Sequence, residues 1–285
     1  MNKILGLKKY FTFIKFSHTV FAMPFAVIGF FLGLENNFDW IIFIYVILCM
    51  VFARSAAMGF NRYIDRDIDS ENPRTSKIRE IPNGSISPKA AIIFVITNCL
   101  LFIATSYLIN FTCFKLSPIA LFIILGYSYT KRFTSLCHLF LGLALSLAPI
   151  GAYIAIKDGI DIVPILFGIC VLFWVSGFDI IYSLQDLVFD KSKKLYSIPV
   201  EIGKKTALKI SRIFHVLSII SLIIVGGIAK FDFFYWIGFF IFSLLLFYQH
   251  TLVKEDDLSK VNIAFFTTNG FASIIFGIFV VISIL

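Results

Sequence analysis

Charged side chains are scarce in this sequence. Only 15% of its 285 residues are charged, whereas 59% are apolar and 17% are aromatic, with 35 phenylalanines. So few charges cannot cover an apolar core with a water-soluble surface, which excludes an ordinary soluble globular protein. The lipid bilayer is therefore the expected solvent.

Cysteine and histidine are also sparse, and neither shows the spacing of a metal site. The 5 cysteines form no C-x-x-C pair, and the 4 histidines are scattered along the chain. We therefore expect packing or interfacial roles for all of them. They are Cys49, Cys99, Cys113, Cys137 and Cys170, and His18, His138, His215 and His250.

Long apolar runs recur from one end of the chain to the other. A hydrocarbon core of roughly 30 Å is crossed by about 20 helical residues. Because unsatisfied backbone groups are costly in lipid and the runs do not alternate, helices are expected rather than barrel strands. The predicted fold is all-α, a polytopic integral membrane protein with about nine spans. These are 17–34, 40–60, 90–109, 116–129, 136–156, 162–182, 210–229, 233–248 and 261–285.

Basic residues are divided unevenly between alternate loops. All of the 25 except Lys115, Lys157 and Lys230 fall on the side that holds the N-terminus. The positive-inside rule places that side in the cytoplasm, so we expect a multi-pass protein of the inner (cytoplasmic) cell membrane. This topology also explains the net charge of +8, without a nucleic-acid partner. No required protein partner is evident.

Acidic residues gather where the second expected span ends. Asn61-x-x-x-Asp65-x-x-x-Asp69 places three oxygen-bearing side chains on one helical face, and Arg54 lies two turns earlier on it. Like charges at this spacing repel each other unless a cation is bound. The pattern therefore points to a cation site.

A second acidic stripe ends the sixth expected span. It contains Asp179, Asp186 and Asp190, with Tyr182 beside it. Mg²⁺ takes carboxylate, water and phosphate oxygens, so two such faces are suited to holding a diphosphate through bridging ions. Solvated helix ends are the alternative. Two stripes on one side of the membrane, each ending an apolar span, favour the metal site.

Basic residues follow both acidic stripes. Arg74 lies in the loop after the first and Lys191 in the loop after the second, while Lys131 and Arg132 follow the fourth expected span. Such groups can neutralise a leaving diphosphate. For any single lysine, a role in setting the topology is the alternative.

We expect one domain over 1–285, and regions 54–84 and 179–203 suggest an internal duplication.

Together these motifs resemble the UbiA superfamily of intramembrane aromatic prenyltransferases, which includes 4-hydroxybenzoate polyprenyltransferases. The resemblance covers nearly the whole chain. It rests on the nine spans and three motifs: Asn61-x-x-x-Asp65-x-x-x-Asp69, Asp179-x-x-Tyr182-x-x-x-Asp186-x-x-x-Asp190, and Tyr127-Ser-Tyr129-Thr-Lys131-Arg132.

The resemblance implies nine helices around a central cavity with a cytoplasmic cap, and an Mg²⁺-dependent enzyme. Asn61, Asp65 and Asp69 would serve one magnesium ion, and Asp186 and Asp190 another. Arg74, Lys131, Arg132 and Lys191 would hold a polyprenyl diphosphate. Asp65, Asp186, Asp179 and Tyr182 would be the catalytic residues, the last two near the allylic carbon and the acceptor. The isoprenoid tail would lie along phenylalanine-rich walls and emerge into lipid.

The acceptor implied by the resemblance is a small aromatic acid of quinone biosynthesis. Three segments are similar to a branch acting on 1,4-dihydroxy-6-naphthoate in menaquinone biosynthesis: Arg54-Ser-Ala-Ala-Met-Gly-Phe60, Tyr182-Ser-Leu-Gln185 and Leu195-Tyr-Ser-Ile-Pro199. The other candidate is 4-hydroxybenzoate, the ubiquinone precursor. Arg54 or Lys15 is suited to holding either carboxylate. The sequence has Phe-Ser-His18-Thr where many relatives carry an arginine.

A secondary transporter of an organic anion is the main alternative, because intramembrane acids and a possible repeat also describe transporters. Against it, the acids lie at one cytoplasmic mouth rather than at the midplane. A phosphotransferase acting on a nucleotide-activated alcohol would carry a single glycine-containing aspartate motif, which is absent.

Overall fold

The computed structural model describes residues 9–10, 12–14, 21–35 and 37–285, and every regular element within them is helical. This confirms the all-α prediction. The longer elements are α2 (Met23–Gly33), α3 (Trp40–Ile64), α4 (Arg66–Glu71), α5 (Pro88–Ile109), α6 (Phe111–Thr130), α7 (Cys137–Lys157), α8 (Ile162–Ser183), α9 (Leu187–Ser192), α10 (Ile198–Ala229), α11 (Phe233–Leu252) and α12 (Asn269–Ile284). A 3₁₀ turn, Leu184–Asp186, joins α8 to α9, and a π-helix, Ile263–Thr268, precedes α12.

Eight of the described helices are long and apolar enough to cross a membrane, and α2 is a shorter apolar helix of 11 residues. The first expected span is therefore seen only in part, because residues 17–20 lie outside the described residues. Lys15 and His18 lie outside them as well.

Two helices begin earlier than their apolar runs because polar residues cap them. The Asn110 side chain accepts a hydrogen bond from the Cys113 amide at 2.7 Å, so α6 begins at Phe111. Ser197 accepts one from the Val200 amide at 3.3 Å, and α10 begins at Ile198. Such caps satisfy first-turn amides that have no partner within the helix.

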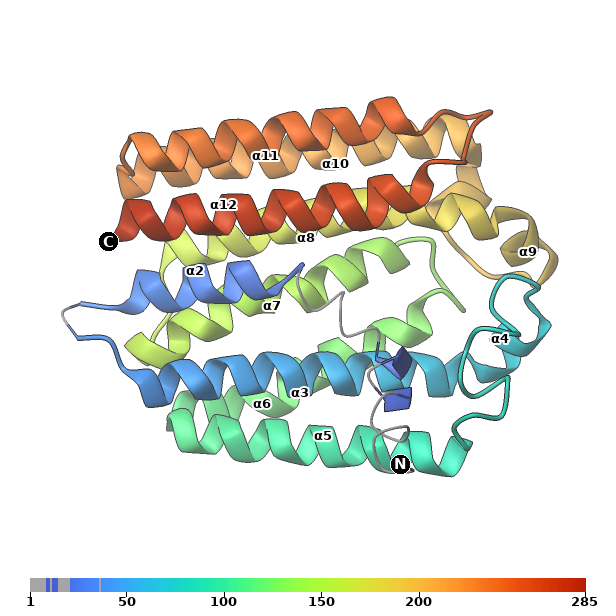
Figure 1. The fold of residues 1–285 in the computed structure, drawn as a ribbon, viewed down its shortest axis with the longest axis horizontal. Helices are drawn as coiled ribbons and strands as arrows, with labels where there is room; N and C mark the ends of the chain where they lie inside the picture. Colours follow the sequence, from blue (N-terminus) through green and yellow to red (C-terminus); the bar gives the residue numbers. More distant parts are fainter. Residues whose placement is uncertain (1–8, 11, 15–20, 36) are drawn as a thin grey trace.

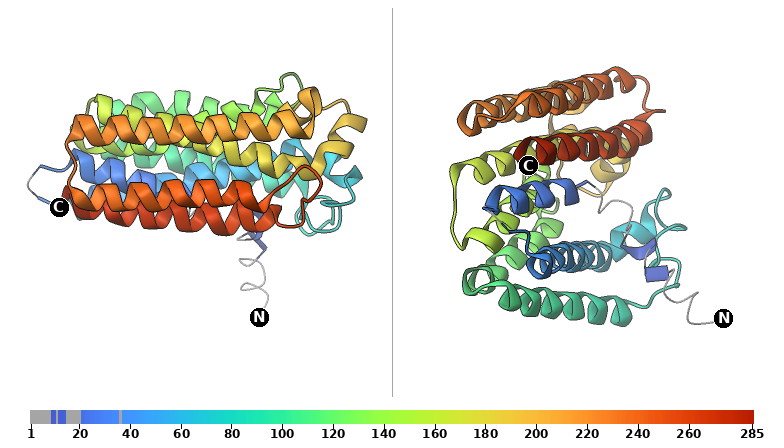
Figure 2. Two further views of the ribbon diagram at one scale, coloured as in Figure 1. Left: turned by 90° about the horizontal axis from the view of Figure 1, so that it is seen from above. Right: turned by 60° about the vertical axis from the view of Figure 1, so that its left-hand side comes forward.

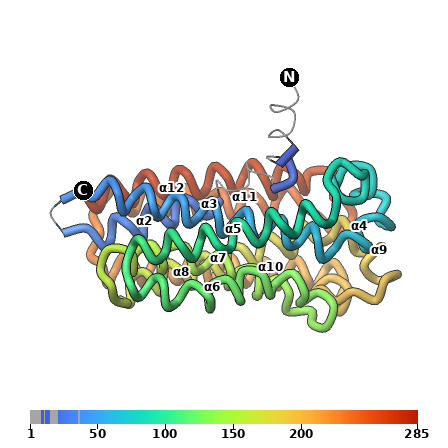
Figure 3. Tube along the Cα trace, turned by 90° about the horizontal axis from the view of Figure 1, so that it is seen from below, coloured from blue at the N-terminus to red at the C-terminus, as the bar shows by residue number. Residues whose placement is uncertain are grey.

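The long helices run roughly side by side, and the segments that follow α3 and α8 meet at one end of the bundle (Figure 1). In the views from above and below, α4 and α9 again lie at that end, opposite the C-terminus (Figures 2 and 3). An ion pair between Lys193 and Glu71 joins the two segments. The two acidic stripes are therefore on the same side, as expected.

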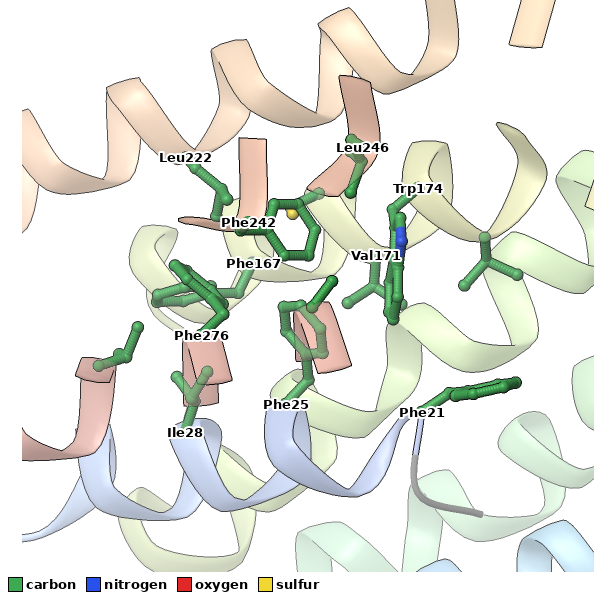
Figure 4. Packing of buried hydrophobic residues seen from close by; sticks show 14 of the residues in the cluster. Phe21, Phe25, Ile28, Phe167, Val171, Trp174, Leu222, Phe242, Leu246 and Phe276 are labelled. Carbon is green, nitrogen blue, oxygen red and sulfur yellow. The ribbon is translucent and has the colours of Figure 1, made fainter. Parts of the chain in front are cut away.

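Phenylalanines supply many of the fully buried side chains of the bundle. Side chains from α2, α8, α10, α11 and α12 form the largest buried apolar cluster (Figure 4). Phe25, Phe167, Phe242 and Phe276 in it are 0% exposed, and Trp174 donates a hydrogen bond to the Asn269 side chain at 2.9 Å. Lipid tails are as apolar as these side chains, so close packing rather than the hydrophobic effect holds these helices together.

Candidate active site

Asp65 lies between the end of α3 and the start of α4, and it is 1% exposed. Its carboxylate accepts hydrogen bonds from Lys131 at 2.6 Å and from Arg132 at 3.0 Å, at the end of α6. Asn61, one turn earlier, donates to it at 3.1 Å. The structure thus brings together four of the residues predicted from the first stripe and from the Tyr127–Arg132 motif.

Asp186, on the second stripe, is likewise a carboxylate that accepts hydrogen bonds from several side chains. Arg74 Nε donates to Asp186 Oδ1 at 2.8 Å, and its Nη2 atom pairs with Oδ2 in a bidentate contact. The same arginine donates from Nη1 to the Tyr182 hydroxyl at 3.1 Å, and Asn72 donates to Asp186 Oδ1 at 3.1 Å. Burial opposes the charge of Arg74, but its hydrogen bonds to Asp186 and Tyr182 raise the pKa of the guanidinium above its ordinary value. Hydrogen bonds from Asn72 and Arg74 therefore connect the loop after the first stripe to Asp186 and Tyr182 of the second.

Asp69 lies one turn beyond Asp65 and is 4% exposed. Its carboxylate pairs with Arg79, and its backbone carbonyl accepts a hydrogen bond from Thr75 at 3.0 Å. Burial raises the pKa of the Asp69 carboxyl, and the charge of Arg79 acts in the opposite direction. Arg79 was not singled out among the expected site residues.

Asp190, the last member of the second stripe, and its neighbour Lys191 are less constrained. Asp190 is half-buried, and no side chain in the described part of the chain donates a hydrogen bond to its carboxylate. Lys191 is exposed, and none of the described carboxylates pairs with it. Among the described residues, no three Asp, Glu, His or Cys side chains converge as a preformed metal site.

Asp179 lies deeper in the bundle, on α8. Its Oδ2 atom is 2.7 Å from Nδ1 of His138, at the start of α7. The helices approach closely at Gly142, where an added Cβ would lie 2.3 Å from the Leu172 carbonyl oxygen. His138 was expected to have a packing or interfacial role, and no pattern linked it to a residue 41 positions away.

An apolar cavity of about 290 Å³ lies between α3, α5, α6 and α7. Arg54 is the only charged residue among the described residues that line it. The Arg54 Nε atom is buried without a hydrogen-bond partner, and no described carboxylate pairs with this side chain. The wall is mainly aliphatic, with Phe102 as its one described phenylalanine, which differs from the phenylalanine-rich wall expected. Many of the phenylalanines instead pack in the buried cluster formed by α2, α8, α10, α11 and α12.

Comparison with known proteins decides the family. Residues 22–274 match the UbiA prenyltransferase family. The chain belongs to this family. It is therefore a membrane-embedded prenyltransferase, and a family of transferases does not support the transporter alternative.

The 4-hydroxybenzoate octaprenyltransferase of Francisella tularensis subsp. mediasiatica (strain FSC147) is 31% identical over 232 residues, covering 81% of each chain. The enzyme of that name from Thiobacillus denitrificans is 28% identical and covers 84% of this chain and 81% of its own.

Solved structures of UbiA proteins have the same fold. A UbiA homolog from Aeropyrum pernix K1 superposes with a TM-score of 0.85 at 30% identity, covering 94% of this chain and 98% of its own. A UbiA homolog from Archaeoglobus fulgidus, solved with GPP and Mg²⁺ bound, superposes with a TM-score of 0.77 at 24% identity and covers 97% and 99%. The prediction of a UbiA-type helical bundle is confirmed.

Proposed function

We propose that this prenyltransferase transfers a polyprenyl group from polyprenyl diphosphate to an aromatic carboxylic acid, in a reaction that requires Mg²⁺. The observation that carries the proposal is the unpaired Arg54 in the wall of an otherwise apolar cavity. A buried cation without a counter-charge is costly, and an aromatic carboxylate would supply that charge. The A. fulgidus homolog, solved with GPP and Mg²⁺, supports the diphosphate and the metal.

The residues of both stripes fit Mg²⁺ by their chemistry. Mg²⁺ usually takes one or two protein carboxylates and fills its other positions with water and substrate phosphate, so a preformed three-acid cluster is not required. Asn61, Asp65 and Asp69 would hold one ion, and Asp186 and Asp190 another. Bound Mg²⁺ would supply positive charge that stabilises the departing diphosphate.

The basic residues around these carboxylates would receive the substrate. Lys131 and Arg132 now bind Asp65, and Arg74 binds Asp186. Each of the three side chains is about one-third exposed, so each can turn from its aspartate to a diphosphate oxygen. Their charges would stabilise the diphosphate as the allylic C–O bond breaks. Lys191, exposed on the same segment as Asp190, would assist from the rim.

The isoprenoid tail would occupy the aliphatic cavity, and the acceptor would lie at Arg54 with Tyr127 beside it. Both 4-hydroxybenzoate and 1,4-dihydroxy-6-naphthoate carry a carboxylate and an electron-rich ring, so Arg54 suits either.

We further propose that the two stripes face the cytoplasm, because the loops on that side carry nearly all of the basic residues.

Arg54→Ala is expected to raise the KM for the acceptor by about 10- to 100-fold, the value of a charge-assisted hydrogen bond. The KM for polyprenyl diphosphate should stay unchanged. An acceptor analogue without its carboxylate is the matched control, because wild type and variant should then use it equally. An equal loss with the analogue would assign Arg54 another role.

The function is tested by incubating the purified protein in lipid with labelled polyprenyl diphosphate and Mg²⁺, offering each of the two acids separately. Prenylation of one or both acids, lost on chelation and restored by Mg²⁺, is the expected result. Diphosphate binding without product from either acid would refute the aromatic acid acceptor.

A further inference from the structure

Helix α10 is longer than a membrane span requires. It has 32 residues and is the longest of the described helices. At 1.5 Å per residue it is roughly 48 Å long, against a hydrocarbon core of roughly 30 Å. It lies with α11 at the outer edge of the bundle, and its start follows α9 at the end where the acidic stripes lie (Figure 1). Because the rest of the helix is apolar, its first part projects beyond the hydrocarbon at that end.

One exposed face of α10 is basic near its start and aliphatic further along. Lys205, Lys209 and Arg212 are exposed and lie on one side of the helix, at steps of four and three residues. The same steps continue this side with three aliphatic side chains that are 53%, 44% and 47% exposed, namely Val216, Ile220 and Ile223. These six residues form the outer face of α10. Positive charge and apolar surface therefore lie end to end on it.

The dimensions of the outer face match one leaflet of a bilayer. Arg212 and Ile223 are about 16 Å apart along the helix axis. Half of the hydrocarbon core is about 15 Å thick, so the aliphatic part of the face spans one layer of acyl chains. The basic part then lies at the level of the lipid headgroups, where long Lys and Arg side chains keep their charges in the polar region.

No protein carboxylate neutralises the basic part of the outer face. In the described part of the chain, no Asp or Glu forms an ion pair with Lys205, Lys209 or Arg212. Glu201 is the only acidic residue of α10, and Gly203, with a φ of 77°, interrupts the helical backbone between it and Lys205. A role in setting the topology requires positive charge here, but it does not require that the charges continue an exposed aliphatic face.

We propose that the outer face of α10 binds an anionic phospholipid, with the phosphate at Lys205, Lys209 and Arg212 and an acyl chain along the aliphatic residues. Arg212 can hold two phosphate oxygens at once, and the two lysines add point charges. A free phosphate would leave the aliphatic part without a ligand, which favours the lipid. None of these residues is assigned to polyprenyl diphosphate, so the inference does not depend on the proposed function.

The test measures which lipid the full-length protein retains. The purified protein is reconstituted in equal parts of phosphatidylglycerol and phosphatidylcholine, and native mass spectrometry gives the ratio of the two lipids that stay bound. Wild type should prefer phosphatidylglycerol. The triple variant Lys205→Gln, Lys209→Gln, Arg212→Gln should lower this preference by about tenfold or more, because each basic residue near an anionic surface contributes about fivefold. Lys205→Arg with Lys209→Arg keeps the charge and should keep the preference.

The matched control removes the same charge from three exposed lysines of the loops, in the variant Lys77→Gln, Lys254→Gln, Lys260→Gln. It should bind lipid as wild type does. Unchanged preference in the α10 triple variant, or an equal loss in the control, would overturn the inference.

Two further results complete the test. If the triple variant fails to insert, the three single glutamine variants replace it, and each should lower the preference several-fold, whereas no change in any of them would overturn the inference. Complete displacement of bound phosphatidylglycerol by polyprenyl diphosphate would assign the outer face to the substrate instead.

Discussion

Asp65→Asn and Asp186→Asn should each lower kcat/KM on the order of 10³-fold, because each removes the negative charge that would hold Mg²⁺ and leaves the shape of the side chain. Asp65 is 1% exposed, yet its partners Lys131 and Arg132 have side chains 30% and 29% exposed. Water can therefore solvate the cations that Asp65→Asn leaves unpaired. We expect both variants to insert and fold.

The measurement is the rate of product formation over a range of Mg²⁺ concentrations, with thermal unfolding in detergent as the check on folding. Asp67→Asn is the matched control, because Asp67 lies two residues after Asp65 on α4, its side chain is 82% exposed, and Arg66 is the only described residue that pairs with its carboxylate. It should retain wild-type kcat/KM. Near-normal turnover in a folded Asp65→Asn or Asp186→Asn enzyme would refute the two-ion arrangement.

Local spacing explains why much of this site was predictable. Asn61 and Asp65 are one turn apart, so helix geometry alone brings their side chains together, and the structure shows them 3.1 Å apart. Long apolar runs likewise predicted the spans, because lipid leaves the backbone few alternatives to helix. The resemblance to UbiA enzymes placed Lys131 and Arg132 at the same site as Asp65, but their ion pairs with Asp65 were not predicted, since helical spacing cannot relate α3 to α6.

Contacts between distant helices were not predictable from single motifs. His138 meets Asp179 only because α7 and α8 approach closely at Gly142, and that glycine has no sequence pattern that names its neighbour. Arg79 belongs to a loop in which several basic residues are equally plausible partners for Asp69. The start of α10 was missed because its first turns mix charged residues, Glu201, Lys204 and Lys205, with apolar ones, and because Gly203 interrupts the helical backbone there with a φ of 77°.

Arg74→Ala is expected to have the second large effect on activity, a loss of kcat/KM of about 10²- to 10³-fold. Arg74 joins the two stripes through Asp186 and Tyr182 and would then bind the diphosphate. Arg74→Lys should recover only part of the rate, because a lysine provides a single point charge and cannot form the bidentate contact.

The readouts for Arg74 are kcat/KM, the KM for polyprenyl diphosphate and the unfolding temperature. Arg74→Ala leaves Asp186 with Asn72 as its remaining described partner, so we expect a modest drop in stability, limited because the Arg74 side chain is 33% exposed. Lys77→Ala removes an exposed charge from the same loop and should leave all three quantities unchanged. Because Arg74 is assigned to both the diphosphate and the contact between stripes, its loss should raise the KM for polyprenyl diphosphate as well as lower kcat. A loss of stability with unchanged kinetics would leave Arg74 with the joining role alone.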